Sequence, residues 1–149
     1  MTGSLEDIVK RIELKVPVNR AFAHFTKGMG EWWPLASHSL SGEAARTVVF
    51  EAHEGGRIFE IDGDGKEREW GRVLACDVNA RLVFSWVLEK PDLATEVEVR
   101  FAPLGESSTQ VTLIHRGWDK RPDGATWREN YLQGWEPVLA QFAARVHAG

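Results

Sequence analysis

The chain has 149 residues, of which 43% are hydrophobic and 27% charged, and its net charge is −4 with acidic and basic residues interspersed. This length suits one domain with a substantial core, so we predict a single domain over residues 1–149. The charge argues against a nucleic-acid-binding protein, which would carry a clustered basic face, and the short apolar runs predict no membrane span.

The chain begins with a predicted strand followed by a helix. Residues 8–16 alternate between apolar and polar side chains, which is the pattern of a half-buried strand. Pro17 ends this strand and suits the first turn of a helix. We expect the inward side of that helix to carry Ala21, Phe22 and Phe25.

Two adjacent tryptophans follow in a second short helical turn, residues 28–34. Neighbouring side chains on a helix point about 100° apart, so Trp32 and Trp33 cannot share a helix face. We expect one to pack inward and the other to face a rim or a partner. Residues 35–45 show no period, which predicts a loop, and we interpret His38 within it as a solvated histidine.

The middle of the chain predicts strands joined by short turns. The six expected strands are residues 47–52, 57–61, 67–78, 81–89, 94–101 and 109–117. Trp70 and Leu74 are expected on one face of their strand. Glu96, Glu98 and Arg100 are interpreted as a solvated face of the sheet.

The C-terminal segment, residues 123–147, predicts one long amphipathic helix. Its apolar stripe comprises Trp127, Tyr131, Leu132, Trp135, Val138, Leu139, Phe142 and Val146. The first half of the stripe is aromatic and the second half mostly aliphatic. Asp123 suits the N-cap, and Pro137 predicts a bend. We infer that the second half closes a core and that the first half roofs a cavity.

Seven tryptophans are many for a chain of this size. Buried indole needs a partner for its N–H, so the excess favours a cavity or a recognition surface, with an aromatic-rich core as the alternative. The single cysteine, Cys76, is interpreted as a buried core thiol and excludes an internal disulfide. The N-terminus lacks the apolar stretch of a secretory signal. Together these features predict a cytoplasmic protein.

The predicted fold class is α+β. Consecutive strands with hairpin-length connections must be antiparallel. The expected architecture is a helix-grip fold, a seven-stranded antiparallel sheet wrapped around a long C-terminal helix with two short helices after the first strand.

Several segments, in this order, resemble a known superfamily. They are Gly71-Arg72-Val73-Leu74, Arg81-Leu82-Val83-Phe84-Ser85-Trp86, Thr95-Glu96-Val97-Glu98-Val99-Arg100-Phe101, Val111-Thr112-Leu113-Ile114-His115-Arg116-Gly117-Trp118, and Tyr131-x-x-Gly134-Trp135-x-x-Val138-Leu139-x-x-Phe142. Together they resemble the START-like (SRPBCC) superfamily, and the most similar branch is the bacterial homologues of the activator of heat-shock-protein-90 ATPase C-terminal domain. The resemblance implies an apolar or amphipathic ligand between sheet and long helix. A minority of such proteins are cyclases, hydrolases or oxygenase subunits, and no catalytic residue carries over.

The sequence holds no recognisable motif for a metal or a nucleophile. The histidines, His24, His38, His53, His115 and His147, lack the spacing of zinc ligands, so we predict no metal and no cofactor. The alternating aspartates of residues 62–65 predict a hairpin turn rather than a calcium loop, because strands flank them. His115 is expected to face the cavity, where a structural role is favoured over acid–base chemistry.

The sequence favours a module that binds a small apolar or aromatic molecule. Aromatic walls with few polar groups suit a flat ligand. The predicted ligand-binding residues are Phe25, Trp32, Trp33, Trp70, Trp86, His115, Trp118, Tyr131 and Trp135. Two alternatives stay open, a chaperone-associated or other protein-interaction domain and a small-molecule hydrolase or cyclase that uses His115 or Tyr131. A homodimer through a strand edge or the tryptophan pair also stays open.

Overall fold

The fold is one antiparallel sheet with a long helix across it, as the computed structural model describes for residues 6–35, 38–39, 41–86, 95–120 and 123–148. The strands among these residues are β1 (Ile8–Leu14), β2 (Ala45–Phe50), β3 (Arg57–Asp62), β4 (Glu67–Asp77), β5 (Arg81–Trp86), β6 (Thr95–Gly105) and β7 (Ser108–Arg116). Their spatial order is β1-β7-β6-β5-β4-β3-β2. Every neighbouring pair is antiparallel. The predicted α+β class is therefore confirmed.

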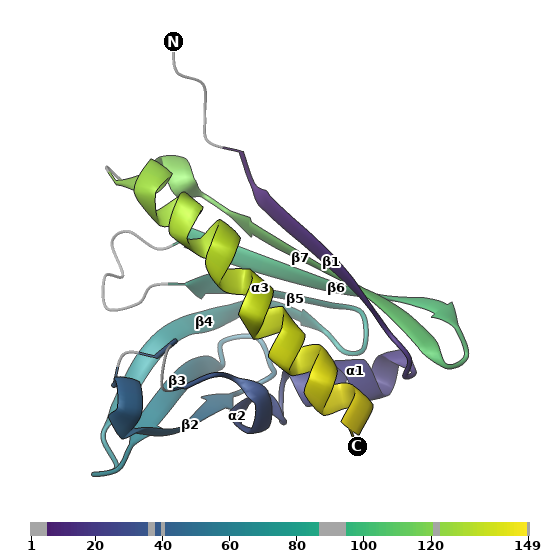
Figure 1. Ribbon diagram of the computed structural model, residues 1–149, viewed down its shortest axis with the longest axis horizontal. Coiled ribbons are helices and arrows are strands. Elements are labelled where there is room, and N and C mark those ends of the chain that lie inside the picture. The colour runs from purple at the N-terminus through teal and green to yellow at the C-terminus, as the bar shows by residue number, and fades with distance from the viewer. Residues whose placement is uncertain (1–5, 36–37, 40, 87–94, 121–122, 149) are drawn as a thin grey trace.

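The helices lie on one side of the sheet (Figure 1). They are α1 (Val18–Phe25), α2 (Met29–Trp32) and α3 (Gly124–Ala148), with short 3₁₀ turns η1 (Gly42–Ala44) and η3 (Trp118–Lys120). In Figure 1 the yellow α3 crosses the curved sheet diagonally, with α1 near its C-terminal end. No helix among the described residues has the length and apolar character needed to cross a membrane.

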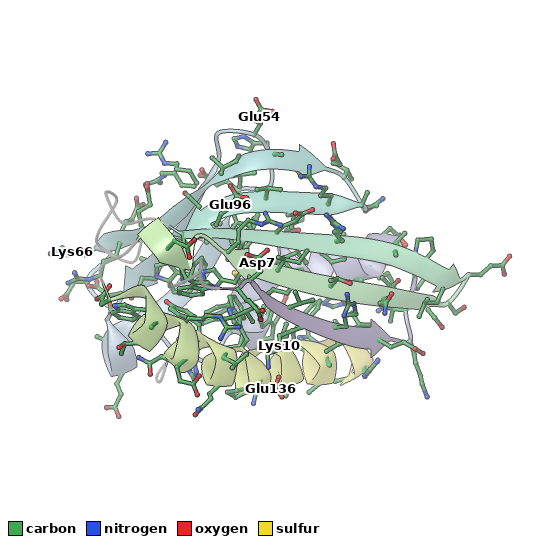
Figure 2. All side chains as sticks on the ribbon, turned by 90° about the horizontal axis from the view of Figure 1, so that it is seen from above. Asp7, Lys10, Glu54, Lys66, Glu96 and Glu136 are labelled. Carbon is green, nitrogen blue, oxygen red and sulfur yellow. The ribbon has the colours of Figure 1, made fainter. Side chains whose placement is uncertain are left out.

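The second half of α3 closes the core, as the apolar stripe predicted. The buried residues of this half are Val138, Leu139, Phe142 and Val146. The Phe142 ring packs 4.9 Å from the Trp32 ring and 5.4 Å from that of Phe25, between ring centroids. The helix continues through Pro137 without interruption. Figure 2 shows α3 on one side of the sheet, and an ion pair of 2.9 Å between Lys10 and Glu136 joins β1 to the helix.

Trp32 packs inward, as expected for one of the two adjacent tryptophans, and Trp33 is largely buried as well. Their exposed fractions are 3% for Trp32 and 8% for Trp33. The α2 helix ends at Trp32, and Trp33 has an extended backbone with ψ of 129°, so the angular rule for helix neighbours does not apply. Each indole N–H donates to a backbone carbonyl, that of His24 at 2.7 Å and that of His38 at 2.8 Å, respectively.

The expected pairing of Trp70 and Leu74 on one face is also wrong. Trp70 is fully buried while Leu74 is 48% exposed. The register of β3 with β4 shifts so that Gly71 and Glu69 have partners in β3 and Trp70 is skipped. Such a bulge reverses the alternation of side chains beyond it. Gly71 permits the close approach of this segment to β5, because a Cβ there would collide with the carbonyl oxygen of Ser85.

The outer face of the sheet is less solvated than predicted, because Glu98 is only 2% exposed. Its carboxylate accepts hydrogen bonds from Arg81 at 2.8 Å, Arg100 at 2.7 Å and Arg116 at 2.7 Å. Burial alone raises the pKa of Glu98, but the three arginines outweigh it and lower that pKa to about 2. Glu96 completes the row at 2.6 Å from Arg116, and Figure 2 shows it on the side away from α3.

Other predictions concern strand ends and the cysteine. Cys76 is half-buried and packs against the core, and burial raises the pKa of its thiol. The predicted strand over residues 81–89 is confirmed to Trp86, and residues 87–89 lie outside the described part of the chain.

Candidate functional site

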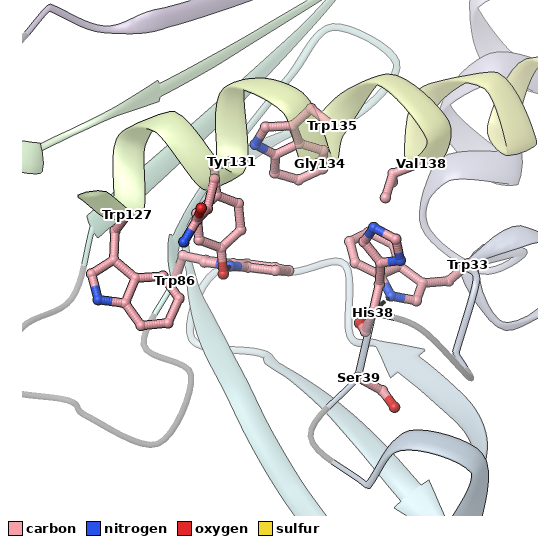
Figure 3. A pocket seen from close by; sticks show the side chains of 10 residues that line it. Trp33, His38, Ser39, Trp86, Trp127, Tyr131, Gly134, Trp135 and Val138 are labelled. Atoms are coloured by element: carbon pink, nitrogen blue, oxygen red, sulfur yellow. Dashed lines mark hydrogen bonds between the residues drawn. The ribbon is translucent and has the colours of Figure 1, made fainter. Parts of the chain in front are cut away.

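A cavity of about 370 Å³ lies under the first half of α3 (Figure 3). Its lining residues are Trp33, His38, Ser39, Trp86, Trp127, Asn130, Tyr131, Gly134, Trp135 and Val138. Those from α3 recur at intervals of three and four residues, which places them on one helix face. Figure 3 shows Trp86 and Trp127 at one end of the cavity, with Trp33, His38 and Val138 at the other. The predicted position of a cavity beneath the aromatic half of the helix is confirmed.

Three indole rings form the main wall of the cavity. The ring centroids of Trp33 and Trp86 are 5.9 Å apart, and that of Trp135 lies 6.0 Å from each of them. Trp70 packs behind this triangle, 5.0 Å from Trp33 and 5.5 Å from Trp86, and has no exposed surface. Tryptophans thus fill the core and still leave space beside it.

The indole N–H groups of the wall are all engaged within the protein. Trp33 donates to the backbone oxygen of His38 at 2.8 Å, and Trp86 donates to the hydroxyl of Tyr131 at 2.9 Å. Trp135 donates to Nδ1 of His115 at 3.1 Å. Indole has one N–H and no acceptor, so this wall offers apolar ring surface to a ligand. The polar lining groups are the side chains of His38, Ser39, Asn130 and Tyr131.

His115 is a structural histidine behind the wall and does not line the cavity. It is fully buried, and its Nε2 lies 2.7 Å from the hydroxyl oxygen of Thr95. Because the indole of Trp135 can only donate, Nδ1 must accept, and the hydrogen-bond pattern assigns the proton to Nε2. Burial lowers the pKa of His115 to about 3. A neutral imidazole with both nitrogens engaged fits the structural interpretation, and the acid–base role does not fit it.

The structure separates the predicted ligand-binding residues into two groups. Four of them line the cavity, namely Trp33, Trp86, Tyr131 and Trp135. Five are buried behind it, namely Phe25, Trp32, Trp70, His115 and Trp118. Trp118 donates its N–H to the backbone oxygen of His115 at 3.0 Å, which fixes it under the start of α3.

Six lining residues are absent from the predicted ligand-binding set, namely His38, Ser39, Trp127, Asn130, Gly134 and Val138. Of these, Trp127 belongs to the aromatic half of the helix that the sequence predicted as the roof of the cavity. The helical period contained a signal for the four in α3, because Trp127, Asn130, Gly134 and Val138 are spaced like Tyr131 and Trp135. His38 and Ser39 gave no signal, because their place depends on how the loop after α2 folds back toward the helix.

No metal site is seen within the described ranges, where His, Cys, Asp and Glu side chains form no group of three or more that could hold an ion. The aspartate-rich turn is a hairpin turn, as predicted. The carboxylate of Asp62 accepts the backbone N–H groups of Asp64 at 2.9 Å and Lys66 at 3.0 Å. Gly65 supplies the left-handed backbone of this turn, with φ of +83°.

Comparison with known proteins finds a matching family and several similar solved structures. The model of the family described as Activator of Hsp90 ATPase homolog 1-like protein matches residues 15–147. A solved structure of Txn09, described as an anthrahydroquino-gamma-pyrone synthase complexed with SUM, is 35% identical with a TM-score of 0.67, covering 97% of this chain and 99% of that chain. The search of curated proteins finds no match.

Two further solved structures are similar. CalC from Micromonospora echinospora, described as a self-sacrificing resistance protein, is 28% identical with a TM-score of 0.74, over 95% of this chain and 94% of that chain. Protein MLL2253 from Mesorhizobium loti is 19% identical with a TM-score of 0.70, over 93% of this chain and 95% of that chain, which shows the shared fold alone.

Proposed function

From the premise that this chain belongs to the family of Activator of Hsp90 ATPase homolog 1-like proteins, in the START-like superfamily, we propose that it binds a flat aromatic small molecule under α3. The family consists of ligand-binding helix-grip proteins. The observation that carries the proposal is the cavity of about 370 Å³ with its wall of three indole rings.

The size and chemistry of the cavity support a small molecule. Sites for such ligands typically enclose about 300–1,000 Å³ and combine apolar walls with a few polar groups. Indole rings stack on aromatic rings, whereas His38 and Asn130 offer hydrogen bonds to substituents on the ring, and the Ser39 hydroxyl, which donates to the backbone oxygen of Leu35 at 2.6 Å, can still accept one. Burying about 200 Å² of apolar ligand surface supplies roughly 5 kcal/mol before entropic costs. The proposed ligand therefore has a fused-ring body with polar groups at its edge.

The similarity to Txn09 also supports an aromatic ligand. The description of Txn09 names a fused aromatic ring system in that protein's product. At 35% identity over nearly the whole chain, a fused-ring phenol is the first candidate ligand for this protein. A suitable probe is 1,8-dihydroxyanthraquinone, with decanoic acid as a non-aromatic comparison.

Gly134 offers a test that separates binding from stability. It lines the cavity, and a Cβ placed there would meet no atom within 4 Å. The Cβ of Gly134→Leu therefore has room, and the rest of the side chain is expected to extend into the ligand's volume. Replacing a glycine inside a helix also favours the folded state by up to about 1 kcal/mol. The expected variant is at least as stable as the wild type and fails to bind.

The measurement is quenching of tryptophan fluorescence by the probe, corrected for probe absorbance. The wild type and Gln133→Leu, a change at the preceding exposed position of α3, are expected to bind with the same Kd. Gly134→Leu is expected to weaken binding at least about tenfold, a difference of about 1.4 kcal/mol. Equal binding by all three proteins would refute the cavity as the site. A flat response by the wild type to both ligand classes would favour the alternative of chaperone association, which a pull-down with the chaperone can examine.

A second candidate function is a synthase or cyclase, which the identity to Txn09 favours. The candidate acid–base groups for such a reaction are Tyr131 and His38, because both line the cavity and His115 does not. Conversion of a bound phenolic probe by the wild type, followed by chromatography and lost in His38→Gln, would support this function. Binding without conversion would leave the protein a binding module.

A further inference from the structure

A fully buried carboxylate lies behind the cavity wall. Glu60 in β3 has no exposed surface, and it lies on the same face of the strand as the core residue Ile58. Its Oε1 accepts the indole N–H of Trp70 at 2.6 Å, and its Oε2 accepts the backbone N–H of Ser41 at 2.7 Å. One side chain thus links β3 and β4 to the loop that follows α2.

Trp70 and Ser41 each connect Glu60 to the cavity wall. Trp70 packs against Trp33 and Trp86, with ring centroids 5.0 Å and 5.5 Å away. Ser41 lies two residues after Ser39, which lines the cavity. A second hydrogen bond joins the same loop to the wall, because the indole N–H of Trp33 donates to the backbone oxygen of His38.

The burial of the Glu60 carboxylate suggests a role other than packing. Removing a charge from water is costly, and an apolar side chain of similar volume often serves stability as well. An apolar side chain cannot hold two N–H groups in fixed directions, whereas a carboxylate has two oxygens for that purpose. Charge-assisted hydrogen bonds of this length are also stronger than those between neutral groups. The two bonds of Glu60 therefore fix the loop relative to Trp70.

Resting on the proposed function, we infer that Glu60 is a positioning residue of the ligand site, which sets the orientation of Trp33 and of the His38–Ser39 wall through Trp70 and Ser41. It does not touch the cavity itself. Replacing Glu60 should therefore change the orientation of the wall, although every residue that lines the cavity is unchanged.

The test compares Glu60→Gln with Glu98→Gln. Each variant replaces a buried carboxylate by its neutral isostere, and Glu98 lies on the outer face of the sheet with three arginines rather than behind the cavity. In Glu60→Gln the amide can accept one N–H, but its NH₂ group opposes the other donor. Ser41→Pro is a second variant, which removes the N–H of Ser41 together with its hydroxyl, at a residue whose φ of −90° lies about 25° from the usual value of proline.

Two measurements decide the inference. Nuclear magnetic resonance of ¹⁵N-labelled indoles reports each tryptophan N–H without any ligand. The Trp70 and Trp33 signals should shift in Glu60→Gln, and that of Trp33 in Ser41→Pro, while Glu98→Gln moves neither. Binding of 1,8-dihydroxyanthraquinone should weaken about tenfold in Glu60→Gln relative to Glu98→Gln, or about 1.4 kcal/mol.

An unmoved Trp33 signal in both Glu60→Gln and Ser41→Pro would overturn the inference, as would equal probe affinity in Glu60→Gln and Glu98→Gln. If the wild type does not bind the probe, the proposed function fails for that ligand class, while the Trp33 signal still decides whether Glu60 positions the wall.

Discussion

Replacing His115 by glutamine is expected to make the stability of the protein less sensitive to acid. The imidazole is fully buried and neutral, with Nδ1 accepting from Trp135 and Nε2 facing the hydroxyl of Thr95. Burial lowers its pKa from 6.5 to about 3, so the native protein does not take up this proton at pH 5. The unfolded chain does take it up, because there the imidazole has its ordinary pKa.

The size of the effect follows from these two pKa values. Below pH 6.5 the unfolded state binds one proton more than the native state, so the free energy of unfolding falls as the pH falls, until the native imidazole titrates near pH 3. At about 1.4 kcal/mol per pH unit, the 1.5 units from pH 6.5 to pH 5 amount to about 2 kcal/mol.

Urea unfolding at pH 7 and pH 5, followed by far-UV circular dichroism, measures the effect. The quantity of interest is the loss of unfolding free energy between the two pH values, compared between wild type and His115→Gln. Other groups, such as His24 with its burial-lowered pKa, contribute equally to both proteins and cancel. The wild type is expected to lose about 2 kcal/mol more than the variant. Equal losses would show that native His115 accepts the proton, and would refute the assignment of a neutral, fully engaged imidazole.

Three further outcomes are expected. Glu98→Gln should lower the free energy of unfolding by about 2 kcal/mol at pH 7, with allowance for the partly exposed arginines. The difference between wild type and variant should shrink as the pH falls from 4.5 toward 2, because the wild-type carboxylate then takes up a proton. A difference in urea unfolding that stays constant across that range would contradict the lowered pKa of Glu98. Tyr131→Phe removes the acceptor of the Trp86 N–H, so it should lower the free energy of unfolding by about 1 kcal/mol and weaken probe binding about fivefold. An unchanged free energy of unfolding together with an unchanged Kd would argue against that hydrogen bond. Millimolar calcium should leave the thermal midpoint unchanged, because the Asp62 carboxylate already holds two backbone N–H groups of its turn, and a rise in that midpoint would contradict the hairpin interpretation.

The features that local periodicity encodes were predicted well. The stripe of α3 buries Phe142 and Val146 as its 3.6-residue period requires, and the alternation of β7 buries Leu113 and His115. The short turns fix antiparallel pairing, because no crossover connection fits between the strands.

Local patterns failed where a contact between distant segments reverses them. The bulge at Trp70 exposes Leu74, because the pairing with β3 skips one residue. Glu98 is buried because arginines from two neighbouring strands and its own strand converge on it, which no pattern within β6 alone could show.

The sequence by itself determined the α+β class, the long helix and the aromatic character of the space beneath it, since each depends on spacing along a single segment. The tertiary structure alone decided which tryptophans face that space and which fill the core. It also brought His38 and Ser39 to the cavity and placed Glu60 behind them. The physical reason is that a wall made from a helix, a strand end and a loop exists only where those segments meet, and the hydrogen bonds that orient it join residues far apart in the chain, such as Trp86 to Tyr131.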